Sequence, residues 1–519
     1  MVLMAADGFA AEAPKAPAYA ITDWVRATEV PVVRLPARAV LSPEEVARIK
    51  QLIANLALIE SPDMGLSSTY GGSAFAPIPQ TTRAGVMILG AERPKTSADL
   101  VELVKLGPKA MPYLLAALDD PTPAKLVIGH PLGSDERIGF GGVFRGNEIA
   151  GNPANRAEQV VIGEKPEGWW TPLSKRTEVK DQRHIVTVGD VCFVIIGQIT
   201  GRSSYRVARY QPSAITIINS PTDDPALVKQ VRAIWSAEDA AQHLLDALLL
   251  DFSTTLNVPK DAPRTLRDQA YGAWFYPFGA AMRLLYYFPE ETEHLVAQRL
   301  VRSADDDAFR RDGFRHMLEA VMWSERSAVR EKVLAVFRET TEPALLLLCL
   351  PAVEQKDNAL VARRIRALLD ALPPATGDDW GNGPYDDAYG LVRAAGERLG
   401  AAAKPIYLRF AEQSSFRRRV ALCAAIRVRP EWAVEFMAPL LDDKREERMW
   451  YPVVAGDHEN RLAIRVCDDA AQAISLSRPD LPFVLQGTHA DLDRQIAVMK
   501  ELIGKASAKA AANKAGGKQ

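Results

Sequence analysis

The sequence predicts an all-α protein whose helices stack as an irregular α-solenoid, interrupted by a segment of loops and short strands. From Ser42 onward, apolar residues recur at helical spacing in segments of ten to twenty residues. Each such helix is apolar on one wide face and must bury that face against neighbouring helices. Residues 124–187 differ, because they are rich in Gly and contain β-branched runs such as HIVTV.

The composition is that of an ordinary globular protein. The 519 residues are 48% hydrophobic and 25% charged, which excludes wholesale disorder, a collagen-like repeat and a membrane bundle. The formal net charge of −2 does not attract the chain as a whole to nucleic acid, so no nucleic-acid partner is expected. The longest apolar stretch, residues 344–350, is far shorter than the roughly 18 residues that span a bilayer, so no membrane span is predicted.

Residues 1–35 are expected to be flexible, and two interpretations of them stay open. The stretch MVLMAADGFAAEAPKAP has a short apolar start and an Ala-x-Ala step at Ala11 to Ala13, but no basic start. It is either a mobile Ala/Pro-rich terminus or the end of a secretory signal. The protein would be periplasmic or secreted in the second case and cytoplasmic in the first.

The four cysteines are expected to be buried thiols. Each lies in or beside an apolar run, and the sequence has no CxxC pair or Cys/His cluster with zinc-ligand spacing. We therefore expect no metal and no cofactor. The cysteines are Cys192, Cys349, Cys423 and Cys467.

Residues 36–123 carry the N-terminal helices. Ser42-Pro43-Glu44-Glu45 supplies an N-cap, a proline at the first helical position and a glutamate at the third. Ser97 opens a second helix that Gly107 ends, and Pro108 begins a third, which ends at Asp119-Asp120-Pro121.

The words LVKLGPKAMPYLLAALDDPTP resemble a HEAT-type helical repeat, with a helix ending in Leu-Gly, a proline, an apolar helix and an Asp-Asp-Pro turn. The resemblance implies a second helix directly after the turn. In this sequence residues 124–187 intervene before the apolar helix GDVCFVIIGQI, so the repeat is predicted to be split by an insertion.

The same order returns near the C-terminus as FMAPLLDD, an interruption over residues 446–463, and VCDDAAQAI. A spacing of 323 positions pairs Tyr113 with Phe436, and a spacing of 278 pairs Asp190 with Asp468. Because the two spacings differ, we expect a repeated unit with insertions of different length. If residues 124–187 only project from the turn, their deletion would leave a folded protein, since loop closure depends weakly on length.

Between the two units, residues 188–445 are predicted to form a helical repeat body. Residues 464–504 complete the C-terminal helices, and the basic, low-complexity residues 505–519 are predicted to be disordered. The helices expected in the body include 225–235, 237–252, 291–301, 309–323, 328–337, 343–352, 358–372 and 385–399. The expected core comprises Leu114, Leu115, Leu118, Cys192, Ile195, Leu440 and Ile474.

No catalytic constellation stands out, so no catalytic residue is assigned. The Gly-rich segment 139–147 lacks the flanking strand and helix of a phosphate loop. Ser73 lacks the glycine that a serine elbow requires two places later. The acidic loop from Asp378 to Asp387 has enough oxygens for calcium but not the EF-hand spacing, so a solvated surface is the preferred interpretation. His184, His243 and His316 lack metal-ligand spacing.

Arginines and aromatic residues form the candidate binding set. They offer planar donors and flat apolar faces, which concentrate binding energy at interfaces. The alternative is structural, with the arginines paired to Asp119, Asp120 or Asp190 and the tyrosines packed inside. The candidates are Trp169, Trp170, Arg202, Tyr205, Arg206, Arg209 and Tyr210.

The sequence therefore favours a non-catalytic binding or scaffolding protein with a protein partner, because solenoids present long concave surfaces. The alternative is an enzyme, such as a hydrolase, whose site is assembled from the loop insertions. Convergent polar groups beneath residues 124–187 would favour the enzyme, and a broad open groove would favour the binding protein.

Overall fold

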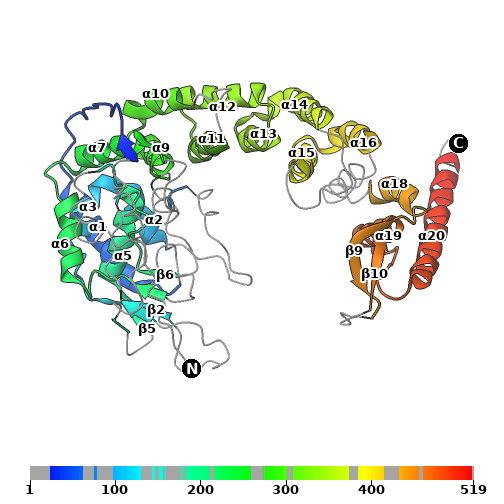
Figure 1. Ribbon diagram of the computed structural model, residues 1–519, viewed down its shortest axis with the longest axis horizontal. Coiled ribbons are helices and arrows are strands. Elements are labelled where there is room, and N and C mark those ends of the chain that lie inside the picture. The colour runs from blue at the N-terminus through cyan, green and yellow to red at the C-terminus, as the bar shows by residue number, and fades with distance from the viewer. Residues whose placement is uncertain are drawn as a thin grey trace, which may run out of the picture. The chain divides into compact units, whose positions relative to one another are not determined.

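A computed structural model shows a predominantly helical protein (Figure 1). The chain divides into two compact units, Met1–Arg330 and Glu331–Gln519, and each is described by itself. The structure describes residues 24–61, 75–78, 97–129, 143–145, 151–155, 158, 177–178, 183–210, 216–258, 273, 275–300, 308–372, 384–413, 432–454 and 460–516.

The helices of the first unit confirm most of the predicted boundaries. They are α1 (Pro43–Asn55), α2 (Ala98–Leu106), α3 (Met111–Ala116), α5 (Val188–Thr200), α6 (Pro225–Trp235), α7 (Ala240–Phe252), α9 (Tyr276–Tyr287), α10 (Pro289–Arg299) and α11 (Ala308–Val321). The predicted capping box of α1 is present, because Ser42 Oγ accepts from Glu45 N and the Glu45 carboxylate accepts from Ser42 N.

The strands of the first unit are short and form three sheets. They are β1 (Val25–Ala27), β2 (Pro123–Gly129), β3 (Val143–Arg145), β4 (Thr177–Glu178), β5 (Arg183–Thr187), β6 (Ala208–Tyr210), β7 (Thr216–Ile218) and β8 (Thr254–Leu256). Strand β1 pairs with β8, β2 pairs with β5, and the other four form a sheet in the order β4-β3-β7-β6.

Helix α5 is the centre of the first unit. All 13 of its residues are buried, because it packs against α1, α2, α3 and α7. The sequence VGDVCFVIIGQIT is apolar around its whole circumference apart from Asp190, Gln198, two glycines and a threonine, which suits a helix enclosed on every side. Both of its ends must therefore satisfy their backbone groups inside the protein.

A β-hairpin joins α3 to α5. Its strands β2 and β5 are antiparallel, with Val127 opposite Ile185 and Ile128 opposite His184. Side chains alternate, so that one face of the hairpin packs on the protein and the other is exposed. The inner face consists of Ala124, Leu126, Ile128, His184 and Val186, and every one of them is buried.

Helix α12 (Ser327–Glu339) crosses the boundary between the units, and the second unit continues with further helices. They are α13 (Pro343–Cys349), α14 (Asn358–Ala371), α15 (Pro384–Leu399), α16 (Lys404–Gln413), α18 (Ala433–Met437), α19 (Val466–Ser477) and α20 (His489–Gly516). One hairpin, β9 (Glu446–Pro452) and β10 (Arg461–Arg465), joins α18 to α19.

The second hairpin repeats the register of the first. Shifting β2 by 323 positions and β5 by 278 converts each recorded pair of the first hairpin into a recorded pair of the second. Val127 opposite Ile185 becomes Trp450 opposite Ala463, and Pro123 opposite Thr187 becomes Glu446 opposite Arg465. The two hairpins therefore share one register at the same spacings that relate the flanking helices.

The turn between the first helix and the hairpin is repeated as well. Gly189 N donates to Asp120 O at 3.0 Å, and Cys467 N donates to Asp443 O at 2.9 Å. Likewise Thr122 N and Arg445 N each donate to the aspartate Oδ1 two positions earlier. We call these equivalent segments the first and second helix–hairpin–helix copies: α3, β2, β5 and α5, and α18, β9, β10 and α19.

Two expectations require correction. Residues 124–187 do not merely project from a turn, because the inner face of the β2–β5 hairpin and the polar residues Asn152 and Glu158 are buried in the first unit. Residues 505–516 continue helix α20 instead of being disordered, since their many Ala and Lys residues have high helix propensity.

The predicted core is confirmed, and Leu115 gives a direct test of it. All seven predicted core residues are buried, Leu115 being 5% exposed. Leu115→Ala should lower the free energy of unfolding by about 2–5 kcal/mol, through lost burial and a residual cavity. Leu58, which is 59% exposed in the same unit, is the control, and Leu58→Ala should change it by less than about 0.5 kcal/mol. Equal melting curves for the two variants would contradict the assignment.

Deleting residues 124–187 should abolish folding of the first unit. The deletion removes strands β3, β4 and β5, nearly all of β2, and the N-cap of α5. It also leaves the buried charges of Arg202 and Asp251 without Glu158 and Asn152. Circular dichroism and gel filtration should show loss of helix and aggregation, whereas deletion of residues 505–519 should leave a folded chain. A soluble deletion variant that melts cooperatively would show that the segment is dispensable.

Candidate functional site

Arg202, the first arginine of the predicted binding set, lies in the interior of the first unit. Its side chain is fully buried between two carboxylates, with Nη2 at 2.5 Å from Glu158 Oε1 and Nη1 at 2.5 Å from Asp251 Oδ2. The faces of Trp235 and Tyr276 flank the guanidinium at 5.4 and 5.2 Å. The structural interpretation of the sequence predicted that the arginines pair with Asp119, Asp120 or Asp190. The residues that pair with this arginine are different ones.

Each carboxylate oxygen in this network accepts a hydrogen bond. Glu158 Oε2 accepts from Asn152 N at 2.8 Å, and Asn155 Nδ2 donates to Oε1 at 3.0 Å. Asp251 Oδ1 accepts from Asn152 Nδ2 at 2.8 Å. These hydrogen bonds and ion pairs therefore connect the segment around residues 151–158 to helix α7, which carries Asp251.

Burial dominates the electrostatics of the network. It raises the pKa of Asp251 to about 6, with Glu158 adding to the shift and Arg202 opposing it. Burial also opposes the charge of Arg202, but the carboxylates of Asp251 and Glu158 overcome it and hold the pKa of Arg202 well above its usual range. Arg202 is thus a permanent cation that holds two acidic side chains in the interior.

The same arginine caps the C-terminus of α5. Arg202 N donates to Gly197 O at 2.8 Å, and Nη1 donates to Thr200 O at 2.9 Å. Gly201 makes the turn with φ of 76°, a left-handed conformation that glycine adopts without a steric penalty. The positive charge at this end of the helix also interacts favourably with the negative end of the helix dipole.

Tyr205 is a packing residue in this structure. It is 2% exposed, its ring stacks on Phe193 at 4.8 Å, and its hydroxyl accepts a hydrogen bond from Trp235 Nε1 at 3.1 Å. A side chain on Gly197 would lie 2.5 Å from Tyr205 Cβ, so this glycine permits the close approach. Because Arg202 and Tyr205 are both buried, the predicted binding set does not form one exposed surface.

The remaining candidates are only partly placed. Arg206 is half-buried, and the backbone of Arg209 and Tyr210 belongs to strand β6. Trp169 and Trp170 lie outside the described residues, as do Asp378, Asp379 and Ser73. Their binding role stays a prediction.

His184 belongs to a structural cluster at the other end of α5. Its Nε2 lies 2.7 Å from Asp190 Oδ2, and Ser220 Oγ donates to Asp190 Oδ1 at 2.5 Å. Asp190 also completes a capping box with Thr187. Ser220 contacts the aspartate and not the histidine, so the three do not have the order of a hydrolase triad.

The outer faces of the two hairpins carry exposed apolar side chains at one equivalent position. Val127 is 47% exposed and Trp450, 323 positions later, is 62% exposed. Ile185, opposite Val127, is 56% exposed. A solvated sheet face ordinarily carries polar residues, and these three side chains leave apolar area exposed on the outer faces.

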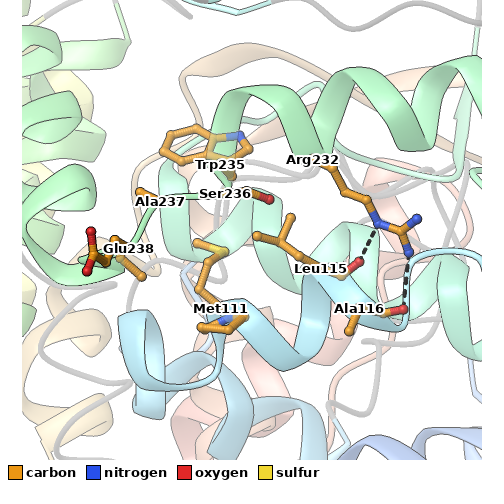
Figure 2. Close-up of a pocket in the computed structure, with 10 residues that line it drawn as sticks. Met111, Leu115, Ala116, Arg232, Trp235, Ser236, Ala237 and Glu238 are labelled. Carbon is orange, nitrogen blue, oxygen red and sulfur yellow. Dashed lines mark hydrogen bonds between the residues drawn. The ribbon is translucent and has the colours of Figure 1, made fainter. Parts of the chain in front are cut away.

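A groove beside the first copy lies between helix α3 and the residues at the end of α6 (Figure 2). It has a volume of about 480 Å³, within the range of small-ligand sites. Figure 2 shows Arg232 at one end, where its guanidinium donates to the carbonyl oxygens of Leu115 and Ala116 at 2.9 and 3.1 Å. The lining residues are Met111, Pro112, Leu115, Ala116, Arg232, Trp235, Ser236, Ala237, Glu238 and Ala240.

Within the described ranges, no group of three His, Cys, Asp or Glu side chains is arranged to hold a metal ion. In the same part of the chain, no helix is both long and apolar enough to cross a membrane. Cys192, Cys349 and Cys467 are buried free thiols, and burial raises the pKa of Cys349 to about 12.

Comparison with protein-family models, with curated proteins and with solved structures finds no match for this chain. The function of the chain is therefore inferred from its own geometry.

Glu158, Asp251 and the exposed hairpin residues were not predicted from the sequence. Glu158 and Asp251 are 93 positions apart and stand in unremarkable surroundings, so no local pattern links them. The hairpin residues did have a signal, because the spacing of 323 that pairs Tyr113 with Phe436 also pairs Val127 with Trp450.

The raised pKa of Asp251 predicts a specific pH dependence. Between its ordinary value of 3.8 and about 6, the folded chain holds a proton that the unfolded chain has released, so this group's contribution to stability falls as pH rises through that window. The free energy of unfolding of the native chain, relative to Asp251→Asn, should fall by about 2 kcal/mol from pH 4 to 6.5. Denaturant unfolding at both pH values measures it. Parallel profiles for the two proteins would contradict the raised pKa.

Proposed function

We propose that this protein is a non-catalytic helical-repeat binding or scaffolding protein, and that it binds a protein partner through the outer faces of its two hairpins. The observation that carries the proposal is the repetition of an exposed apolar side chain at one register position, Val127 in the first copy and Trp450 in the second.

Physical chemistry supports a contact role for this position. The inner face of the first hairpin is buried, as are Tyr451 and Ile464 of the second, so the exposed side chains are not needed to bury these residues. Tryptophan is among the residues that contribute most to protein interfaces, because a single ring removes a large apolar area from water. On the first hairpin, exposed Lys125 and Arg183 border Val127 and Ile185, which gives the polar rim typical of an interface.

The enzyme alternative draws on the polar network beneath residues 151–158. Convergent polar groups do lie there, and Asp251 has a raised pKa, as general acids often do. However, all four oxygens of Glu158 and Asp251 accept hydrogen bonds within the protein, and Arg202 is fully buried. The geometry therefore favours a structural role for the network and a binding role for the molecule.

The proposal predicts that hairpin residues affect binding and not folding. Affinity capture with the full chain identifies the partner, whose affinity for Trp450→Ala should fall about thirtyfold, equivalent to roughly 2 kcal/mol. Ile185→Ala should weaken binding in the same direction. The melting temperature of each variant should stay close to that of the native chain, since both side chains are exposed.

Val498→Ala is the matched control, because Val498 is 56% exposed on α20. It should bind the captured partner as the native chain does. Unchanged binding by both hairpin variants, or an equal loss with the control, would refute the proposed surface.

A further inference from the structure

The outer face of the first hairpin carries a cationic residue on each strand beside its exposed apolar side chains. Lys125 precedes Val127 by two positions on β2, so both lie on one face of the strand, and both are exposed. On β5, Arg183 precedes Ile185 by two positions, and both are again exposed. The register places Ile185 opposite Val127 and Arg183 opposite Gly129. The apolar pair therefore lies between one cation on the side of the helices and one on the opposite side.

The second hairpin repeats both cationic positions. The spacing of 323 positions pairs Lys125 with Arg448, and the spacing of 278 positions pairs Arg183 with Arg461. Arg448 precedes Trp450 by two positions on β9, and Arg461 is exposed on β10. The two copies, which otherwise differ in sequence, thus keep a basic residue on each strand beside an exposed apolar one.

Acidic residues are scarce at the same positions. On the first hairpin, no outward position of β2 or β5 holds an acidic residue in the part of the chain that the structure describes. On the second hairpin, Glu446 is exposed at the start of β9, four positions before Trp450. The formal net charge of the whole chain is −2, so the positive charge is a local property of these faces. Cations around an apolar centre complement a partner that carries acidic residues around an apolar one.

We propose that each hairpin face binds an extended acidic segment of the protein partner, in which one apolar residue has an acidic residue two positions before it and another two positions after it. This inference rests on the proposed function, because it names the chemistry that the same surface recognises. Alternate side chains of an extended segment point to one face at a repeat of roughly 7 Å, which is also the repeat of the hairpin strands. The apolar side chain contacts Val127 or Trp450, and the carboxylates lie near the cations on either side.

Two other classes of partner, nucleic acid and anionic membranes, also bind surfaces that are both cationic and apolar. Single-stranded nucleic acid is held by stacking on aromatic rings, but the outer face of the first hairpin has Val127 and Ile185 at its centre. Membrane binding grows with the apolar area that is buried, and two aliphatic side chains supply little of it. A protein segment matches both the small apolar centre and the flanking charges.

A short synthetic peptide tests the proposal on the full chain. It has glutamate, leucine and glutamate at alternate positions, serine between them and a fluorescent label. Fluorescence anisotropy should show saturable binding at low salt, and the affinity should fall about tenfold from about 20 to about 200 mM sodium chloride. The same peptide with lysine in place of both glutamates should not bind. Absence of binding by the acidic peptide, or equal binding of both peptides, would overturn the proposal.

Charge reversal at the two equivalent arginines, Arg183→Glu together with Arg461→Glu, should weaken binding of the acidic peptide about tenfold. The reason is that attraction at each face becomes repulsion. Lys50→Glu together with Lys332→Glu is the matched control, because these exposed lysines lie on helices and their reversal changes the net charge equally. The control variant should bind the peptide as the native chain does. Equal losses in the two double variants would reveal an effect of net charge alone and refute the inference.

Two further measurements separate this inference from the proposed function. If the captured partner binds the arginine double variant normally but binds Trp450→Ala weakly, the hairpin surface stands and the acidic segment is wrong. If the acidic peptide binds Trp450→Ala combined with Ile185→Ala as tightly as the native chain, the apolar centre is not recognised and both proposals fail. Vesicles of phosphatidylserine and phosphatidylcholine should not compete with the peptide, and competition would assign the surface to a membrane instead.

Discussion

The complete burial of helix α5 is the constraint on which the first unit depends. A helix leaves unpaired N–H groups at its start and unpaired carbonyls at its end, and α5 has no access to solvent that could satisfy them. The start is satisfied by Thr187, Asp190 and the carbonyls of the preceding turn. The end is satisfied by Gly201 and by the side chains of Arg202 and Arg283. The buried charge of Arg202 must then be compensated, and this places Glu158 and Asp251 in the interior.

In the second copy the corresponding helix is also buried, but less completely. Helix α19 buries only one face, and its Asp468 corresponds to Asp190. Asp468 pairs with Arg465 at 2.8 Å, whereas Asp190 pairs with His184, so each copy supplies a cationic or hydrogen-bonding partner from its own hairpin. Because the hairpin anchors the helix in both copies, its outer face is held rigidly. A rigid apolar surface suits recognition, since little conformational entropy is lost on binding.

Sequence patterns predicted what is local. The capping box at Ser42 and the helix over 225–235 follow from spacing and from short-range chemistry, and both are present in the structure. The two hairpins also share one register at the spacings of 323 and 278 positions. The network around Arg202 was not predictable, because its members meet only after the chain folds. The sequence left Arg202 and Tyr205 open between a binding role and a packed structural role, and the structure buries both side chains. Exposure at Trp450 depends on which face of the hairpin packs inward, and a single strand of mixed residues does not determine that.

Native-state hydrogen exchange tests the central position of α5 most directly. If the helix is enclosed and satisfied at both ends, the amides of residues 188–200 should exchange only when the first unit unfolds globally, as slowly as any in that unit. The amides of α19, which is exposed on one face, should exchange faster. Exchange of α5 through local opening, at rates equal to or above those of α19, would contradict this account of the structure.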